Sequence, residues 1–163
     1  MIVLEMTMGQ QAEKPKMIDH VDKDILVLLQ EDCRLSYDKI AKRLNIARGT
    51  ANNRLKKLEK NAFIKSYSTI LDSNKLGYDF TTIILLHIEG DPNMKLLDKL
   101  RNFPNVIGIY DITGDYAIAL IAKFKNRFLL NSFIKNFLSK STVKRTATNV
   151  ALKVIKEDFK VEP

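Results

Sequence analysis

The residue types best suited to chemistry lie between positions 48 and 60, where amide and basic side chains recur at helical spacing. At about 100° per residue, one side of such a helix has no apolar side chain and carries Gly49, Asn52, Asn53, Lys56 and Lys60. Asparagine can form a bidentate pair with adenine in the major groove, and lysine binds phosphates. Glycine near the helix start would let the backbone approach a duplex closely. The pattern therefore predicts a DNA-binding face.

The opposite side of the same helix carries a narrow apolar stripe, formed by Ala51, Leu55, Leu58 and Ala62. Residues 42–60 contain seven basic residues and one acidic residue, Glu59. A solvated face is the simpler interpretation of a Lys-rich helix in isolation. Here, however, another short helix directly precedes it, and two short helices joined by a tight turn are typical of a helix-turn-helix.

We therefore predict that double-stranded DNA contacts the basic helix and the start of the helix before it. The predicted DNA-binding residues are Ser36, Tyr37, Arg48, Gly49, Thr50, Asn52, Asn53, Arg54, Lys56, Lys57 and Lys60. Arg54 lies at the edge of the apolar stripe, so an ion pair with an acid of the first helix is an equal alternative to a phosphate contact.

Sequence signals for catalysis are weak. The two histidines, His20 and His87, are far apart in the sequence, and Cys33 is the single cysteine. The sequence has no phosphate-binding glycine loop and no GxSxG nucleophile motif. We therefore predict no enzymatic activity, catalytic residue, metal site or cofactor. His87 is interpreted as a sheet residue with satisfied hydrogen bonds, and Cys33 as a small apolar residue.

Three helices are needed to position the predicted DNA-binding face. Helical periodicity begins at Asp19, and Ser36 is placed to cap a second helix over Tyr37–Leu44. The basic helix follows over about Arg48–Lys60. Asn61 is suited to the left-handed conformation that ends a helix. Alternating side chains then predict a strand over residues 63–71.

The second half of the sequence alternates between strands and helices. The predicted elements are strands over 80–89, 106–113, 116–124 and 143–155, and helices over 94–102 and 127–139. The order β-α-β-β-α-β is that of a ferredoxin-like domain. Helices cover only one face of such a sheet, and the strand over 80–89 is apolar almost throughout, which favours a protein partner on the other face.

The predicted fold class is thus α+β, with an N-terminal winged-type helix-turn-helix domain followed by a ferredoxin-like βαββαβ effector and dimerisation domain. Its expected parts are a disordered tail over 1–16, a DNA-binding domain over 17–71, a linker over 72–79, and a ligand-sensing and dimerisation domain over 80–163. The net charge of +8 favours a polyanionic partner. No apolar run approaches the ~20 residues of a membrane helix, and no signal peptide is evident, so we predict a cytoplasmic protein without membrane contact.

The sequence resembles the Lrp/AsnC, or feast/famine, family of transcriptional regulators. In the first half the matching residues are Ile18, Asp19, Asp22, Ile25, Leu26, Leu29, Gln30, Asp32, Arg34, Ser36, Ile40, Ala41, Leu44, Arg54, Leu58, Glu59, Ile64, Leu76 and Gly77. In the second half they are Pro104, Asn105, Val106, Thr113, Gly114, Asp115 and Tyr116. The resemblance implies DNA binding by the first half, and a homodimer in which two sheets pair face to face. Dimers of the family often assemble further, so a tetramer or octamer is also open.

The resemblance further implies a small-molecule effector, such as an amino acid, near the Gly-Asp-Tyr turn. From the residues alone, Gly114-Asp115 is simply a good hairpin turn. The candidate effector-binding residues are Gly114, Asp115, Tyr116, Thr146 and Thr148. The two threonines, which share one face of the last strand, are the weaker candidates.

Three positions depart from the family pattern. Ala47 replaces the usual Ser at the start of the basic helix, which removes a cap worth about 1 kcal/mol, and Asn61 replaces Gly. Ala117 stands where the family usually has Asp. If that carboxylate normally pairs with the ammonium of an effector, its loss costs about 1.5–3 kcal/mol, and ordinary α-amino acids should bind weakly or not at all. The alternative is that Ala117 faces the sheet core.

Two other functions are open. Sirohaem decarboxylases resemble this family but have a degenerate DNA-binding half and use basic residues and histidine on an anionic tetrapyrrole. The basic, asparagine-bearing helix argues against that reading. The second alternative is an architectural DNA-binding protein without an effector.

Overall fold

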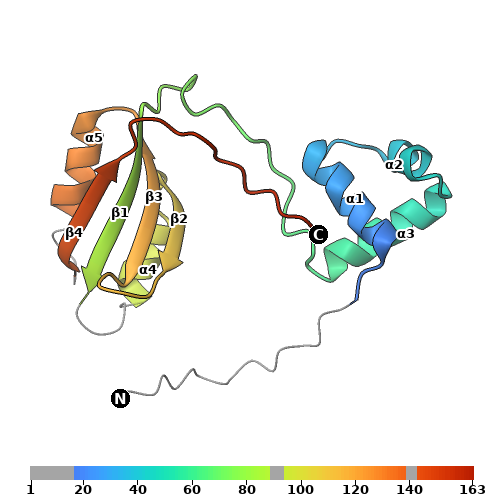
Figure 1. Cartoon of the computed structure of the whole chain (residues 1–163), viewed down its shortest axis with the longest axis horizontal. Helices are drawn as coiled ribbons and strands as arrows, with labels where there is room; N and C mark the ends of the chain where they lie inside the picture. The colour runs from blue at the N-terminus through green and yellow to red at the C-terminus, as the bar shows by residue number, and fades with distance from the viewer. Residues whose placement is uncertain (1–16, 89–93, 139–142) are drawn as a thin grey trace, which may run out of the picture. The chain divides into compact units, whose positions relative to one another are not determined.

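The computed structural model describes residues 17–88, 94–138 and 143–163, so the predicted tail lies outside the described residues (Figure 1). The chain forms two compact units. The first ends at Thr69 and also includes Asp158–Pro163, whereas the second spans Ile70–Glu157. The predicted linker thus lies within the second unit, and the end of the predicted second domain lies within the first.

Three helices form the first unit: α1 (His20–Glu31), α2 (Tyr37–Leu44) and α3 (Arg48–Lys60). Asp19 caps α1 in a capping box, because its carboxylate accepts from the Asp22 backbone N–H at 2.9 Å, and the Asp22 carboxylate accepts from the Asp19 N–H at 3.3 Å. No side chain caps α3, as its Ala47 N-cap leads us to expect.

The core of this unit brings the buried faces of all three helices together. Its buried residues are Ile25, Leu29, Ile40, Ala41, Ala51, Leu55 and Leu58. The predicted apolar stripe of α3 is therefore buried, except for Ala62, which lies beyond the helix and is exposed.

The connections after α3 differ from the prediction. Asn61 has φ −88°, and it is Ala62, with φ +59°, that takes the left-handed conformation. Residues 63–71 form no strand, although their side-chain pattern alternates. A strand needs a hydrogen-bonded neighbour as well as a pattern, and the strands of the described residues pair only with one another.

The last residues of the first unit contact α1. The Gln30 side chain donates from Nε2 to the Val161 carbonyl at 2.8 Å, and its Oε1 accepts from the Val161 N–H at 2.9 Å. A single carboxamide therefore binds both backbone groups of one residue.

The second unit contains the four-stranded antiparallel sheet, in the order β2-β3-β1-β4. Its elements in chain order are β1 (Phe80–Ile88), α4 (Met94–Arg101), β2 (Val106–Asp111), β3 (Ile118–Phe124), α5 (Arg127–Ser132), the π-helix η1 (Phe133–Leu138) and β4 (Val143–Val150). The predicted βαββαβ order and the α+β class are confirmed. Three strands are shorter than predicted; β4, for example, ends where its pairing with Thr82 of β1 ends.

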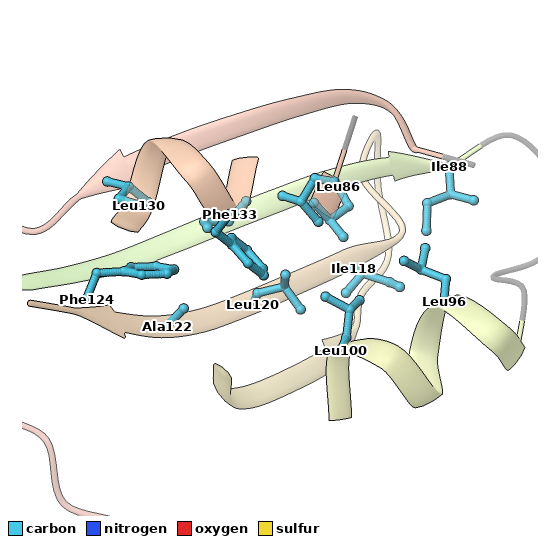
Figure 2. Packing of buried hydrophobic residues seen from close by; sticks show 12 residues of the cluster. Leu86, Ile88, Leu96, Leu100, Ile118, Leu120, Ala122, Phe124, Leu130 and Phe133 are labelled. Atoms are coloured by element: carbon cyan, nitrogen blue, oxygen red, sulfur yellow. The ribbon is translucent and has the colours of Figure 1, made fainter. Parts of the chain in front are cut away.

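The core of the second unit lies on the face of the sheet that the helices cover. In Figure 2, Leu96 and Leu100 of α4, with Leu130 and Phe133 of α5 and η1, point toward Leu120 and the other buried side chains of β1 and β3. The predicted single helix over 127–139 is instead an α-helix that continues as a π-helix.

The other face of the sheet carries apolar side chains that the helices do not cover. Cross-strand register places Ile83 and Leu85 of β1 on this face beside Ile121 and Ala119 of β3, and Ala147 of β4 lies opposite Leu85. Ile83 remains 47% exposed. We refer to these residues as the open sheet face. A partner on this face stays a prediction.

Candidate nucleic-acid interface

The outward side of α3 presents most of the predicted DNA-binding residues. Its exposed residues are Arg48, Gly49, Thr50, Asn53, Lys56, Lys57, Glu59 and Lys60. They cover the side of the helix that faces away from the buried residues Ala51, Leu55 and Leu58. A Cβ atom placed at Gly49 would meet no other atom within 4 Å, so the start of α3 is open to an approaching backbone. No acidic residue occurs in the first turn of α3.

The two adjacent asparagines differ in accessibility. Asn53 is exposed, whereas Asn52 is half-buried. The Asn52 Oδ1 atom is buried and has no hydrogen-bond partner among the described residues. Because a bidentate pair with adenine needs both the oxygen and the nitrogen of the amide, Asn53 is the better placed of the two to read a base.

Arg54 joins α3 to the start of α1. Its Nη1 donates to Asp19 Oδ2 at 2.7 Å and to Asp22 Oδ1 at 2.8 Å. Asp22 is 3% exposed, so its buried carboxylate depends on the charge of the Arg54 guanidinium. The Asp22 backbone N–H and the Arg54 guanidinium lower the pKa of Asp19. These contacts support the ion-pair alternative for Arg54 over a phosphate contact.

Two acids border the basic surface, and each has a partner. Asp38 of α2 forms an ion pair with Arg48, whose Nε lies 3.1 Å from Asp38 Oδ1. Glu59 of α3 accepts from the Tyr67 hydroxyl at 2.8 Å. Burial, followed by the hydrogen bond to Glu59, raises the pKa of Tyr67.

The start of α2 has a structural role. The exposed Ser36 side chain accepts from the Lys39 N–H at 3.4 Å and so caps α2. Tyr37 is half-buried and packs against the core of the first unit. A phosphate contact from Ser36 would therefore have to share its hydroxyl with the cap.

The candidate effector region lies at the β2–β3 hairpin, where Gly114 takes φ +110°. The Asp115 carbonyl lies 2.6 Å from the His87 Nδ1, which must therefore donate to it. The Arg145 guanidinium lies 5.3 Å from the centre of the Tyr116 ring. His87 and Arg145 are direct cross-strand partners, so β1 and β4 bring both to the hairpin.

The two threonines of β4 lie on the other face. Thr146 pairs with Leu86 and Thr148 with Ile84, whose side chains are fully buried beneath the helices. The structure thus groups Asp115 and Tyr116 with Arg145 and not with the threonines. Sequence reasoning missed Arg145, because only the register of β4 against β1 decides which of its side chains share a face.

Ala117 is half-buried and packs against the core of the second unit. Its backbone N–H donates to the Leu86 carbonyl at 3.0 Å, and its carbonyl accepts from the Ile112 N–H at 3.0 Å. This supports the alternative that alanine at this position is a packing choice.

The described parts of the chain contain no cluster of His, Cys, Asp and Glu side chains able to hold a metal ion. In the same residues, no helix has the length and apolar character needed to cross a membrane.

Comparison with known proteins gives matches for both units. Residues 18–65 match a winged helix-turn-helix DNA-binding model, and residues 81–161 match the Lrp/AsnC ligand binding domain. An uncharacterized HTH-type transcriptional regulator of Pyrococcus furiosus is 45% identical over 146 residues, which cover 90% of this chain and 99% of that protein.

Solved structures share the fold. A transcriptional regulator from Neisseria meningitidis, solved as a complex with L-Met, aligns with a TM-score of 0.83 at 23% identity, over 89% of this chain and 96% of that one. AsnC of E. coli aligns with a TM-score of 0.81 at 23% identity, over 90% of this chain and 99% of that one.

Proposed function

Because the chain belongs to the Lrp/AsnC family of transcriptional regulators, we propose that it binds specific double-stranded DNA sequences through α3 and regulates the genes beside them in the cytoplasm. The observation that carries this proposal is the outward side of α3, which is basic and exposed while its opposite side is buried in a three-helix core. The recognition helix of a helix-turn-helix enters the major groove in this way.

The residues on α3 divide into two groups. Asn53 and Arg48 lie exposed toward the helix start, the part of a recognition helix that reads base edges. Lys56, Lys57 and Lys60 lie further along and supply phosphate contacts, which are independent of sequence. This division assigns specificity and affinity to different ends of one helix.

A second copy of this chain is the partner that we assign to the open sheet face. The strand register places apolar side chains on that face, and burying them would remove apolar surface from water. A dimer would also present two copies of α3, which operators with two half-sites about 34 Å apart require.

A small-molecule effector is the second ligand that we propose. The match to the Lrp/AsnC ligand binding domain supports it, as does the L-Met in the Neisseria complex. The hairpin groups the cation of Arg145 with the Tyr116 ring and the Asp115 backbone, which suits a ligand that bears a carboxylate.

The alternative of a tetrapyrrole decarboxylase gains no support from the histidines. His20 lies on α1 of the first unit, and His87 of the second unit is engaged with the Asp115 carbonyl. We therefore assign no catalytic role.

The proposal is tested by selecting bound fragments from the source genome. The affinity of the full chain for the selected duplex is then compared with that for a scrambled duplex, by fluorescence anisotropy across a salt series. We expect a preference of at least about a thousandfold. Lys56→Ala should weaken both duplexes alike and reduce the salt slope by about one. Equal affinity for both duplexes would instead indicate an architectural DNA-binding protein.

A further inference from the structure

An acid from α2 holds the first residue of the recognition helix. Asp38 Oδ1 lies 3.1 Å from Arg48 Nε, and the side chains of Asp38 and Arg48 are 65% and 71% exposed. Asp38 lies in the first turn of α2, and Arg48 begins α3. The pair therefore links the two helices of the helix-turn-helix at the surface.

Stability is a weak explanation for this pair. Ion pairs between exposed side chains contribute little, because water and salt screen them. An acid beside a DNA-binding surface also repels phosphates. Asp38 thus opposes DNA binding in general, and its position calls for an effect specific to Arg48.

The chemistry of the guanidinium suggests that effect. Arginine has five N–H donors in a rigid plane, and the ion pair with Asp38 lies on the Nε side of the Arg48 guanidinium. The two Nη groups remain available as a pair of parallel donors, the arrangement that binds the O6 and N7 atoms of guanine. Arg54 is different, because its Nη1 is committed to two carboxylates.

We propose that Asp38 is a specificity-determining residue that acts by positioning Arg48 to read one guanine of the bound sequence. Arg48 makes the base contact, and Asp38 holds its guanidinium from the Nε side through the ion pair. This inference rests on the proposed function and deepens it, because it assigns a guanine to the half-site beside the start of α3.

The inference requires two effects of opposite sign from one substitution. Asp38→Asn removes a negative charge, which strengthens binding to any DNA or leaves it unchanged. The same substitution frees Arg48, which weakens binding to the selected duplex. A purely electrostatic role for Asp38 would shift both duplexes in the same direction.

The experiment measures the affinity of the full chain for the selected and scrambled duplexes by anisotropy. We expect Asp38→Asn to lower the ratio of the two affinities about tenfold, and Arg48→Ala to lower it at least as much. Asp24→Asn is the matched control, because Asp24 is an exposed acid on α1 and its loss changes the net charge equally. This control should leave the ratio unchanged.

A double-mutant cycle and a modified base locate the effect. In the Arg48→Ala background, Asp38→Asn should no longer change the ratio. Replacing one guanine of the selected duplex by 7-deazaguanine removes its N7 acceptor. At one position this should weaken the wild-type chain but not Arg48→Ala.

Three outcomes would overturn the inference while the wild-type chain still prefers the selected duplex. In the first, Asp38→Asn leaves the ratio of the two affinities unchanged. In the second, Asp38→Asn lowers that ratio equally in the Arg48→Ala background. In the third, no 7-deazaguanine substitution weakens the wild-type chain more than Arg48→Ala. Absence of any wild-type preference would contradict the proposed function itself, and the inference with it.

Discussion

Arg54 donates to the buried carboxylate of Asp22 at 2.8 Å, so the recognition helix is held to the first turn of α1 by a charged hydrogen bond. The same guanidinium also reaches Asp19, the N-cap of α1. The sequence pattern leaves Arg54 equally open to a DNA contact or an ion pair. In the structure it forms ion pairs with both Asp19 and Asp22.

Replacing Arg54 by methionine should destabilise the chain by about 3 kcal/mol, because it leaves the Asp22 carboxylate buried without its partner. The unfolding midpoint in urea measures this loss. Lys56→Met, a change at an exposed lysine of the same helix, is the control and should be nearly neutral. An unchanged midpoint together with weaker binding to all DNA would instead assign Arg54 to a phosphate.

Stability should depend on pH through Asp19. Its pKa in the folded chain lies below the ordinary value of 3.8, because the Asp22 N–H and Arg54 favour the carboxylate. The stabilisation is therefore fully present above that ordinary value and is lost as the pH falls through the lowered pKa. Thermal melts of wild type and Asp19→Asn should differ by a constant amount down to about pH 4 and converge as the pH falls further. A constant difference down to pH 2 would contradict the assignment.

Asn53→Ala should relax sequence preference at one or two base pairs and cost about 1–3 kcal/mol on the selected duplex. Asn52→Ala should have the smaller effect on preference, because its Oδ1 is buried. Binding measured on a set of single-base variants of the duplex separates the two. A larger loss of preference in Asn52→Ala would reverse the roles.

The open sheet face should hold a second copy. Light scattering at micromolar concentration is expected to give at least twice the 18.7 kDa of one chain. Ile83→Asp should reduce the mass, because a charge would be buried at the centre of the interface. Leu129→Asp, at a similarly exposed residue of α5 on the opposite side of the sheet, is the control. A wild-type mass of one chain would rule out the proposed dimer.

Ala117→Asp should destabilise the second unit by about 1–3 kcal/mol, since it places a carboxylate against the core. Urea unfolding measures this effect. If the carboxylate missing at position 117 also matters for the effector, calorimetry of wild type with the common amino acids should detect no micromolar binding. Micromolar binding would show that the effector site does not need a carboxylate at position 117 and would leave packing as the role of Ala117.

Local signals fixed the helix-turn-helix well. The bounds of α2 and α3 agree with those predicted, because the Ser36 cap and the apolar spacing both lie within a few residues of each helix. The end of α3 is the exception: Ala62 and not Asn61 takes positive φ, despite the side-chain preference for asparagine.

Features that depend on contacts between distant segments could not be predicted from the sequence pattern. The alternation over residues 63–71 could not reveal that no described strand pairs with it. Likewise, the sequence of β4 could not indicate whether Arg145 or Thr146 faces the hairpin residues, because a shift of one residue in register exchanges the two faces. The partnership of Arg54 with Asp22 was open for a similar reason, since it depends on how two helices pack.

The contact between Gln30 and Val161 makes the first unit discontinuous in sequence. In topological terms, the sheet-bearing unit is an insertion within the DNA-binding unit, entered after Thr69 and left before Asp158. A fragment cut at residue 69 would therefore lack residues 158–163 of its own unit. A change within the inserted unit can also reach the helices along two covalent paths, where a simple tandem arrangement would offer one.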